Sequence, residues 1–246
     1  MKKRLDVFLV ENNFFETRIK AQTEIKNGKV LVDGKVAKPS LLVDDKSVIK
    51  VLDDTLKYVS RAGLKLEKAK QEFDLDFVDK VVLDIGSSTG GFTDFCLKNG
   101  AKKVYAVDVG TNQLHKDLRQ NKKVVLMEQT DIRNTNPKDF CDVDIAVCDV
   151  SFISLTKICN SVKEILGKNK PLVALIKPQF ECGKEIAKKY KGVIKDPKIH
   201  NQVIESVVKY FKANGFSLLQ ICQSPIKGGD GNLEFLSYFV TNHSLN

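Results

Sequence analysis

The chain has 246 residues, of which 42% are hydrophobic and 29% charged, and its formal net charge is +9. These proportions exclude wholesale disorder, and no uncharged apolar run reaches the roughly 18 residues that a membrane span needs. The basic balance is that of a protein with a polyanionic partner, most often nucleic acid. The basic start Met1-Lys2-Lys3-Arg4 is not followed by the apolar core of a signal peptide. We therefore expect a cytoplasmic protein that contacts no membrane.

The six cysteines and three histidines carry no signal of a metal site. The cysteines show no C-x-x-C spacing, and His115, His200 and His243 are too isolated in the sequence for a metal site or a catalytic triad. We expect reduced thiols and no bound metal.

The first 52 residues predict a small α+β domain of two helices and a hairpin. The second helix begins at a capping Thr17 and ends before Gly28, a residue suited to the left-handed position after a helix. The pair Asp33-Gly34 predicts a tight turn between two strands. The expected elements are helices over 4–12 and 17–27 and strands over 30–32, 35–36 and 47–51.

Basic residues are concentrated in this domain, where residues 1–38 hold nine Lys and Arg against five Asp and Glu. Such a face can lie along phosphates or can simply be solvated, and charge alone does not separate the two. The pattern R-L-D-V-F-L-V, followed by T-R-I-K-A-Q-T-E-I-K-N-G-K-V-L-V-D-G-K-V, closely resembles the small αL RNA-binding module shared by a small-subunit ribosomal protein and several RNA-modifying enzymes. The resemblance implies docking on structured RNA. The candidate RNA contacts are Arg4, Arg18, Lys20, Lys26, Lys35 and Arg61.

Beyond a linker over 53–60, strands and helices alternate, and this pattern predicts a second domain over 61–246. The first helix of that domain covers 61–73. The strands are expected near 80–85, 103–108, 123–128, 143–149 and 171–177, the later helices near 90–99, 155–166 and 198–213, and a closing antiparallel pair over 216–223 and 233–240. The fold class is α/β, with a Rossmann-like sheet of seven strands whose closing hairpin matches the methyltransferase variant.

A glycine turn follows the first strand of this sheet, with the spacing G-x-x-x-G-G at Gly86, Gly90 and Gly91 behind Asp84. This spacing is neither the dinucleotide fingerprint nor the phosphate-binding loop, and no lysine follows it. Asp108 ends the next strand, where a carboxylate accepts hydrogen bonds from ribose hydroxyls. A ribose without a pyrophosphate indicates S-adenosylmethionine, and D-x-G-x-x-x-G-G resembles the first motif of the methyltransferases that use it. The alternative is a tight turn with close helix packing.

The candidate cofactor contacts are Asp84, Gly86, Ser88, Gly90, Gly91, Phe92, Asp108, Asp131 and Asp149. Asp131 follows the third strand and is placed to meet the adenine side, although a helix cap explains it equally well. Asp149 ends the fourth strand and Lys177 the fifth. Since ligands of open α/β sheets bind beyond the carboxyl ends of the strands, both side chains should face the reactive end of the cofactor.

The whole chain resembles the TlyA family, the haemolysin-A-like ribosomal RNA 2′-O-methyltransferases, which join the αL module to an FtsJ-like catalytic domain. The motifs that carry the resemblance are Y-V-S-R-A-G-L-K-L, D-I-G-S-S-T-G-G-F-T-D, C-D-V-S-F-I-S-L, L-I-K-P-Q-F-E and G-N-L-E-F-L. In that family a Lys-Asp-Lys-Glu tetrad serves methyl transfer, and the matching residues here are Lys65, Asp149, Lys177 and Glu234. The resemblance implies methylation of a cytidine 2′-hydroxyl, with ribosomal RNA or a ribosomal subunit as partner. We also expect a monomer or a weak dimer.

The tetrad suits this chemistry because a ribose hydroxyl must lose its proton as it attacks the sulfonium methyl. A lysine can take that proton if its pKa is lowered, and burial beside a second ammonium group has this effect. We expect Lys177 to be this base beside Lys65, with Asp149 and Glu234 orienting the two ammonium groups. Two other functions remain open at this point: a non-catalytic RNA-binding ribosome assembly factor, and a membrane-lytic haemolysin.

Overall fold

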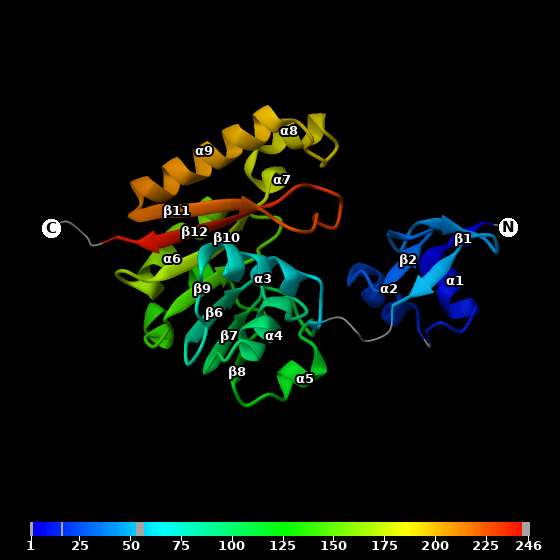
Figure 1. The fold of residues 1–246 in the computed structure, drawn as a ribbon, viewed down its shortest axis with the longest axis horizontal. Helices are drawn as coiled ribbons and strands as arrows, with labels where there is room; N and C mark the ends of the chain where they lie inside the picture. The colour runs from blue at the N-terminus through cyan, green and yellow to red at the C-terminus, as the bar shows by residue number, and fades with distance from the viewer. Residues whose placement is uncertain (1, 16, 53–56, 243–246) are drawn as a thin grey trace. The chain divides into compact units, whose positions relative to one another are not determined.

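The structure is a computed structural model that describes residues 2–15, 17–52 and 57–242. Its contacts divide the chain into two compact units, residues 1–61 and 62–246, which Figure 1 shows. The predicted linker over 53–60 falls partly on residues 53–56, which lie outside the described residues. The exact ends of the two predicted domains therefore stay a prediction.

The first unit packs two helices against small sheets. Its helices are α1 (Leu5–Glu11) and α2 (Arg18–Lys26), its three-stranded sheet has the order β3 (Lys35–Val36), β2 (Val30–Val32), β5 (Ile49–Val51), and β1 (Lys3–Arg4) pairs with β4 (Leu42–Val43). The sequence did not indicate β1 and β4, because two residues are too few to show an alternating pattern.

Local sequence signals explain the boundaries of these elements. The Thr17 hydroxyl accepts a hydrogen bond from the Lys20 amide at 3.2 Å, as an N-cap does, and Gly28 has a φ of +75° just after α2. Asp33 and Gly34 have φ of +50° and +76°, so both central residues of the turn lie in the left-handed region. The predicted cap, helix end and hairpin turn are confirmed.

The second unit is built on one seven-stranded sheet of order β11-β12-β10-β9-β6-β7-β8. Strand β12 runs antiparallel to both of its neighbours, and the other pairs are parallel. The strands are β6 (Val81–Ile85), β7 (Lys103–Val107), β8 (Val124–Met127), β9 (Ile145–Cys148), β10 (Pro171–Ile176), β11 (Phe216–Gln223) and β12 (Phe235–Thr241). The predicted Rossmann-like α/β fold is confirmed.

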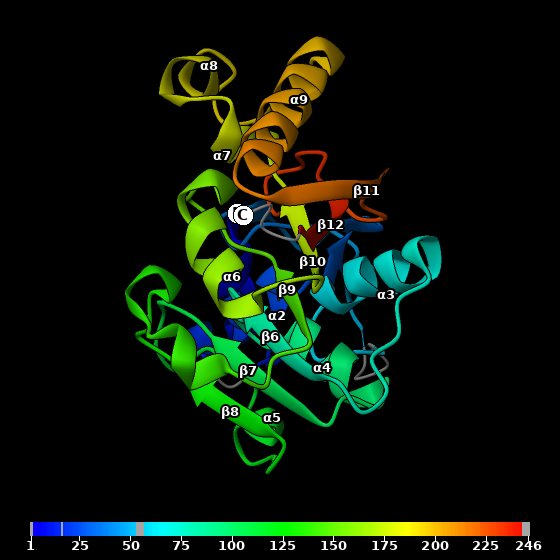
Figure 2. The same cartoon turned by 90° about the vertical axis from the view of Figure 1, so that its left-hand side faces the viewer.

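Helices cover both faces of this sheet, with α3 and α4 on one side and α6 and α9 on the other (Figure 2). The helices are α3 (Ala62–Phe73), α4 (Gly91–Lys98), α5 (Lys116–Arg119), α6 (Cys159–Leu166), α7 (Pro178–Glu181), α8 (Lys184–Lys189) and α9 (Pro197–Ala213), and short 3₁₀ turns are η1 (Ile132–Asn134), η2 (Pro137–Phe140) and η3 (Leu155–Lys157). The sequence did not indicate α5, α7 and α8, because four to six residues span too few turns for a helical period to appear.

The topology fixes where a ligand can bind. The chain adds β7 and β8 on one side of β6 and then returns to place β9 and β10 on the other, so the strand order reverses between β6 and β9. Both of these strands are buried along their whole length, which holds their carboxyl ends rigidly. In open α/β sheets the crevice at such a reversal is the usual ligand site.

No helix among the described residues has the length and apolar character that a membrane crossing requires.

Candidate functional site

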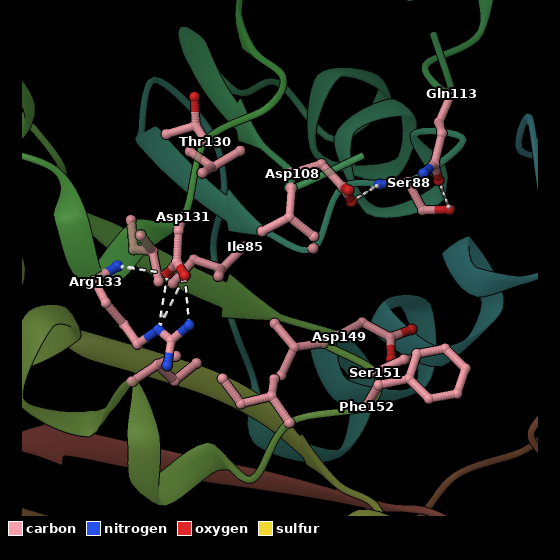
Figure 3. A pocket seen from close by; sticks show the side chains of 17 residues that line it. Ile85, Ser88, Asp108, Gln113, Thr130, Asp131, Arg133, Asp149, Ser151 and Phe152 are labelled. Carbon is pink, nitrogen blue, oxygen red and sulfur yellow. Dashed lines mark hydrogen bonds and ion pairs between the residues drawn. The ribbon is translucent and has the colours of Figure 1, made fainter. Parts of the chain in front are cut away.

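A cavity of about 750 Å³ opens at the carboxyl ends of β6, β7 and β9, where the strand order reverses (Figure 3). This volume falls within the roughly 300–1,000 Å³ of typical small-molecule sites. Of the residues predicted to hold a cofactor, Gly86, Ser88, Asp108, Asp131 and Asp149 line it. Its remaining walls are largely apolar.

Asp108, which directly follows β7, is held in place by backbone amides. One carboxylate oxygen accepts a hydrogen bond from the Ser88 amide at 2.8 Å, and the other accepts from the Gly110 amide at 2.7 Å. The Ser88 hydroxyl bonds the amide oxygen of Gln113 at 3.2 Å, which ties the glycine turn to the loop after β7. Each carboxylate oxygen can still accept a further hydrogen bond, because it has two lone pairs.

Asp131 stands on another side of the cavity, locked by Arg133 (Figure 3). The Arg133 Nε atom lies 2.9 and 3.1 Å from the two carboxylate oxygens, and the Arg133 amide donates to the same carboxylate at 3.0 Å. Hydrogen bonding to Arg133 lowers the pKa of Asp131, so the group remains an ionised acceptor. Asp131 therefore both caps η1 and lines the cavity, and the two explanations from the sequence are compatible.

The other predicted cofactor residues, Asp84, Gly90, Gly91 and Phe92, are not part of the cavity lining. At Gly90, where φ is +96°, a β-carbon would come within 2.3 Å of a methyl group of Leu118, so close packing accounts for this glycine. The roles of these four residues in cofactor binding stay predictions.

Asp84 is fully buried under the turn. The Thr93 hydroxyl donates to one carboxylate oxygen at 2.6 Å, while the other oxygen has no hydrogen-bond partner among the described residues. Burial raises the pKa of Asp84 to about 7, and the hydrogen bond from Thr93 offsets only part of this effect.

The four residues of the predicted tetrad meet in one buried cluster. The Lys65 ammonium group, on α3, lies 2.7 Å from Glu234 and 3.0 Å from Asp149. The second oxygen of Asp149 lies 2.7 Å from the Lys177 ammonium group, which also donates to the Ser151 hydroxyl at 2.9 Å. All four charged side chains are at most 12% exposed. Two positive and two negative charges therefore alternate in a single chain of contacts.

In Lys65 and Asp149 the ion pairs of the cluster outweigh the effect of burial on the pKa. Burial lowers the pKa of Lys65, yet the facing Asp149 and Glu234 carboxylates raise it above its ordinary value overall. Burial likewise raises the pKa of Asp149, and the ammonium groups of Lys177 and Lys65 bring it down to about 2. Lys65 is consequently a fixed cation, and Asp149 a fixed anion shared between two lysines.

The sequence matches two known protein families. Residues 58–240 match the FtsJ-like methyltransferase family, and residues 3–49 match the S4 domain. The chain belongs to the FtsJ-like methyltransferases. The predicted family and enzyme class are therefore confirmed.

Relatives and solved structures agree with this assignment. A protein of Bacillus subtilis provisionally named rRNA methyltransferase YqxC is 48% identical, over 96% of this chain and 84% of that protein. The 23S rRNA (cytidine-2'-O)-methyltransferase TlyA of Campylobacter jejuni is 38% identical, over 96% of this chain and 98% of that protein. A Streptococcus thermophilus structure provisionally named a hemolysin has a TM-score of 0.77 at 44% identity, covering 99% of this chain and 90% of that chain.

Three further residues of the FtsJ-like domain shape the site and were not singled out from the sequence. Ser151 bonds Lys177, and Phe152 lines the cavity while its side chain is 92% exposed with a φ of +65°. Glu181 accepts hydrogen bonds from the Ser154 hydroxyl at 2.5 Å and the Leu155 amide at 2.7 Å, which anchors the loop behind Phe152. The position of Ser151 just beyond the end of a strand could have indicated its role. No signal in the neighbouring sequence indicates that Phe152 is exposed.

In the S4 domain, two of the predicted RNA contacts converge on one buried carboxylate. Asp6 is fully buried and accepts hydrogen bonds from Arg4 at 3.0 Å, from Arg18 at 2.9 Å and from Gln22 at 2.6 Å. Hydrogen bonding to Arg4 lowers the pKa of Asp6 far below its ordinary value, despite the opposing effect of burial. Arg4 and Arg18 thus stabilise the domain, while about half of each side chain, 44% and 53%, stays exposed.

The other predicted RNA contacts differ in exposure. Lys20, Lys26 and Lys35 are exposed, and within the described ranges no acidic group pairs with them. Arg61 is half-buried against Gly28, and burial lowers its pKa. RNA contact by each of these residues stays a prediction.

The described residues hold no group of three or more His, Cys, Asp or Glu side chains placed to bind a metal ion.

Proposed function

We propose that this protein transfers a methyl group from S-adenosylmethionine to the 2′-hydroxyl of a cytidine in ribosomal RNA. The observation that carries the proposal is the buried cluster of Lys65, Asp149, Lys177 and Glu234 beside a cavity at the sheet reversal. The name of the Campylobacter jejuni relative supports cytidine in 23S rRNA as the acceptor. A cytoplasmic location is part of this proposal.

The cavity fits the proposed cofactor. The ordered carboxylate of Asp108 has lone pairs left for the two hydroxyls of a ribose, and the ionised Asp131 can accept from an exocyclic amine of adenine. Apolar side chains such as Ile132 and Val109 supply flat walls for an aromatic ring. When bound, S-adenosylmethionine supplies an electrophilic methyl group.

The acceptor side of the site is formed by the loop after β9. Asp149 lines the cavity and binds Lys177, so the lysine amine lies next to the space where a reacting hydroxyl must enter. Phe152 projects beside it, and its ring contacts that of Phe180 with centroids 5.1 Å apart. An exposed aromatic ring at this position can stack on the base of an unpaired nucleotide.

In the proposed reaction the two lysines have different tasks. Lys65 keeps its proton, because two carboxylates hold it, and it orients Asp149. Lys177 would accept the proton of the ribose hydroxyl as the oxygen attacks. The bond from this oxygen to the methyl carbon would form as the bond from that carbon to the cofactor sulfur breaks, so a neutral thioether would leave and the proton would end on the lysine nitrogen. General base assistance of this kind is typically worth about 10²–10⁴-fold in rate. The deprotonation of Lys177 that this step requires stays a prediction.

The test is methyl transfer to ribosomal RNA from cells that lack this gene, with mass spectrometry to locate the modified ribose. We expect one methyl group on a cytidine 2′-oxygen with the native protein, and a loss of about 10²–10⁴-fold in rate with Lys177→Met. The matched control is Lys212→Met, an exposed lysine on α9, which should keep full activity.

Cofactor affinity, measured by calorimetry, separates a chemical defect from a folding defect, since Lys177→Met should still bind S-adenosylmethionine. Tight RNA binding by the native protein without any transfer would refute the proposed enzyme and favour the assembly-factor function. Methylation of a base instead of a ribose would refute the proposed acceptor.

A further inference from the structure

The FtsJ-like domain carries a second concentration of basic residues, outside the S4 domain. Residues 183–198 contain six lysines against two acidic residues. The lysines are Lys184, Lys188, Lys189, Lys191, Lys195 and Lys198, and all six are exposed. Among the described residues none of them forms an ion pair. We call this segment, with its helix α8, the basic segment.

Both ends of the basic segment are connected to the buried cluster of Lys65, Asp149, Lys177 and Glu234, which we call the catalytic cluster. It begins directly after α7, which follows Lys177, and in Figure 1 helix α8 lies next to α7 and the first turns of α9. At its other end, the Asn232 side chain accepts from the Ile194 amide at 2.8 Å and donates to the Gly192 carbonyl at 2.8 Å. Asn232 belongs to the loop that leads into Glu234.

The same loop is tightly packed against the catalytic carboxylate. A β-carbon at Gly228 would lie 2.5 Å from a carboxylate oxygen of Glu234, and the Gly228 amide donates to the Asn232 carbonyl at 3.0 Å. The carbonyl of Ile194 bonds the ring of the buried His200 at 3.0 Å, so α9 holds the segment from the other side. The basic segment is therefore fixed in position relative to Glu234 and Lys177.

We propose that the basic segment binds the phosphate backbone of the RNA substrate on the flank of the catalytic site. This inference rests on the proposed function and names a second RNA contact surface for it, in addition to the S4 domain. The six ammonium groups are exposed and outnumber the two acidic residues of the segment, and among the described residues none of the six forms an ion pair. Exposed ammonium groups of this kind bind phosphates and release their counterions. A nucleotide entering the site is thereby held on the catalytic domain itself.

A membrane surface fits the basic segment less well. Helices that lie on membranes present a large apolar face beside their basic residues. Here no large hydrophobic side chain of residues 183–198 is exposed, and Ile194 is buried. The segment therefore offers a binding partner charged groups and no large exposed apolar side chain, which suits the phosphates of a nucleic-acid backbone.

The test compares two triple variants of the full chain that remove equal charge. One is K184Q/K188Q/K191Q in the basic segment. The control is K168Q/K209Q/K212Q, three exposed lysines, of which Lys168 precedes β10 and the others lie in the last turns of α9. Because β10 is parallel to the strands that line the cavity, this edge of the sheet is opposite to the catalytic one.

Affinity for ribosomal RNA from cells lacking the gene is measured across a salt series. For single-stranded nucleic acid, each phosphate contact makes the slope of log affinity against log salt more negative by about 0.7. Loss of three contacts should therefore make the slope less steep by about 2, which corresponds to an affinity about 50-fold lower than that of the native protein at about 0.15 M salt. We expect this change in the basic-segment variant only, with unchanged affinity for S-adenosylmethionine in both variants.

Equal RNA affinities and salt slopes in the two variants would overturn the inference. It would also be overturned if the basic-segment variant kept its RNA affinity but lost binding to vesicles containing phosphatidylglycerol. The proposed function fails in a different way, when the native protein itself neither binds nor methylates the RNA.

Discussion

Substitution of Asp84 by Asn tests whether a buried carboxyl group, with no ion-pair partner among the described residues, makes the stability of the FtsJ-like domain depend on pH. Asp84 is fully buried, and burial raises its pKa from 3.8 to about 7. Between these two values the native state binds more protons than the unfolded state, so the free energy of unfolding falls as the pH rises. The side-chain amide of the Asp84→Asn variant would not titrate, and it would keep an oxygen to accept from Thr93.

The magnitude follows from the two pKa values. With 3.8 unfolded and about 7 folded, the destabilisation by Asp84 is about 2 kcal/mol at pH 5 and about 4 kcal/mol at pH 8. The unfolding free energy of Asp84→Asn minus that of the native sequence should therefore grow by about 2 to 3 kcal/mol over this range. Asp149, with its pKa of about 2, stays ionised throughout in both proteins and does not contribute to the difference.

The assay is urea denaturation of both proteins at pH 5 and pH 8 without cofactor, followed by a probe of the FtsJ-like domain. The exposed Asp76→Asn, which keeps an acceptor for the Val78 amide, serves as the control and should give the same difference at both pH values. A difference between Asp84→Asn and the native sequence that does not change with pH would show that the carboxyl group is not desolvated as the structure indicates.

Two further substitutions test the walls of the cavity. Asp108→Ala should weaken S-adenosylmethionine binding by roughly 1.5–3 kcal/mol for each lost hydrogen bond to the carboxylate, measured by calorimetry, and unchanged affinity would exclude the ribose contact. Phe152→Ala should lower kcat/KM for RNA by about 5- to 150-fold, the equivalent of about 1–3 kcal/mol of base stacking, without changing thermal stability, since the ring is 92% exposed. The exposed Val78→Ala is its control, and equal kcat/KM for the two variants would exclude stacking.

Features that depend on neighbouring residues were predictable from the sequence. The hairpin turn needs two adjacent residues with positive φ, and Asp33-Gly34 is a pair that accepts this conformation. Likewise the strand β6 and the glycine turn after it follow from an uninterrupted apolar run that meets Gly86, where φ is +81°. In both places the local preference and the tertiary structure agree.

Contacts between distant residues were not predictable from spacing. Lys65 lies 84 positions before Asp149 and 169 before Glu234, so its selection depended on resemblance to a family. The same limit applies to Arg18, which shares a carboxylate partner with Arg4, although Arg4 itself lies only two positions from that partner. Their shared partner Asp6 is separated from Arg18 by 12 positions, and only the folded helix pair brings the three together.

The alternation of charge in the catalytic cluster explains why the proposed reaction requires a second lysine. When Lys177 is neutral, Asp149 and Glu234 face the single positive charge of Lys65, and the four buried groups carry one net negative charge. Proton transfer from the ribose hydroxyl to Lys177 returns the cluster to neutrality, which is favourable where water is excluded. Without Lys65, the net charge of the cluster at this point of the reaction would be −2, and no cation would face the two buried carboxylates. In the proposed reaction Lys65 therefore balances one of the two buried carboxylates throughout.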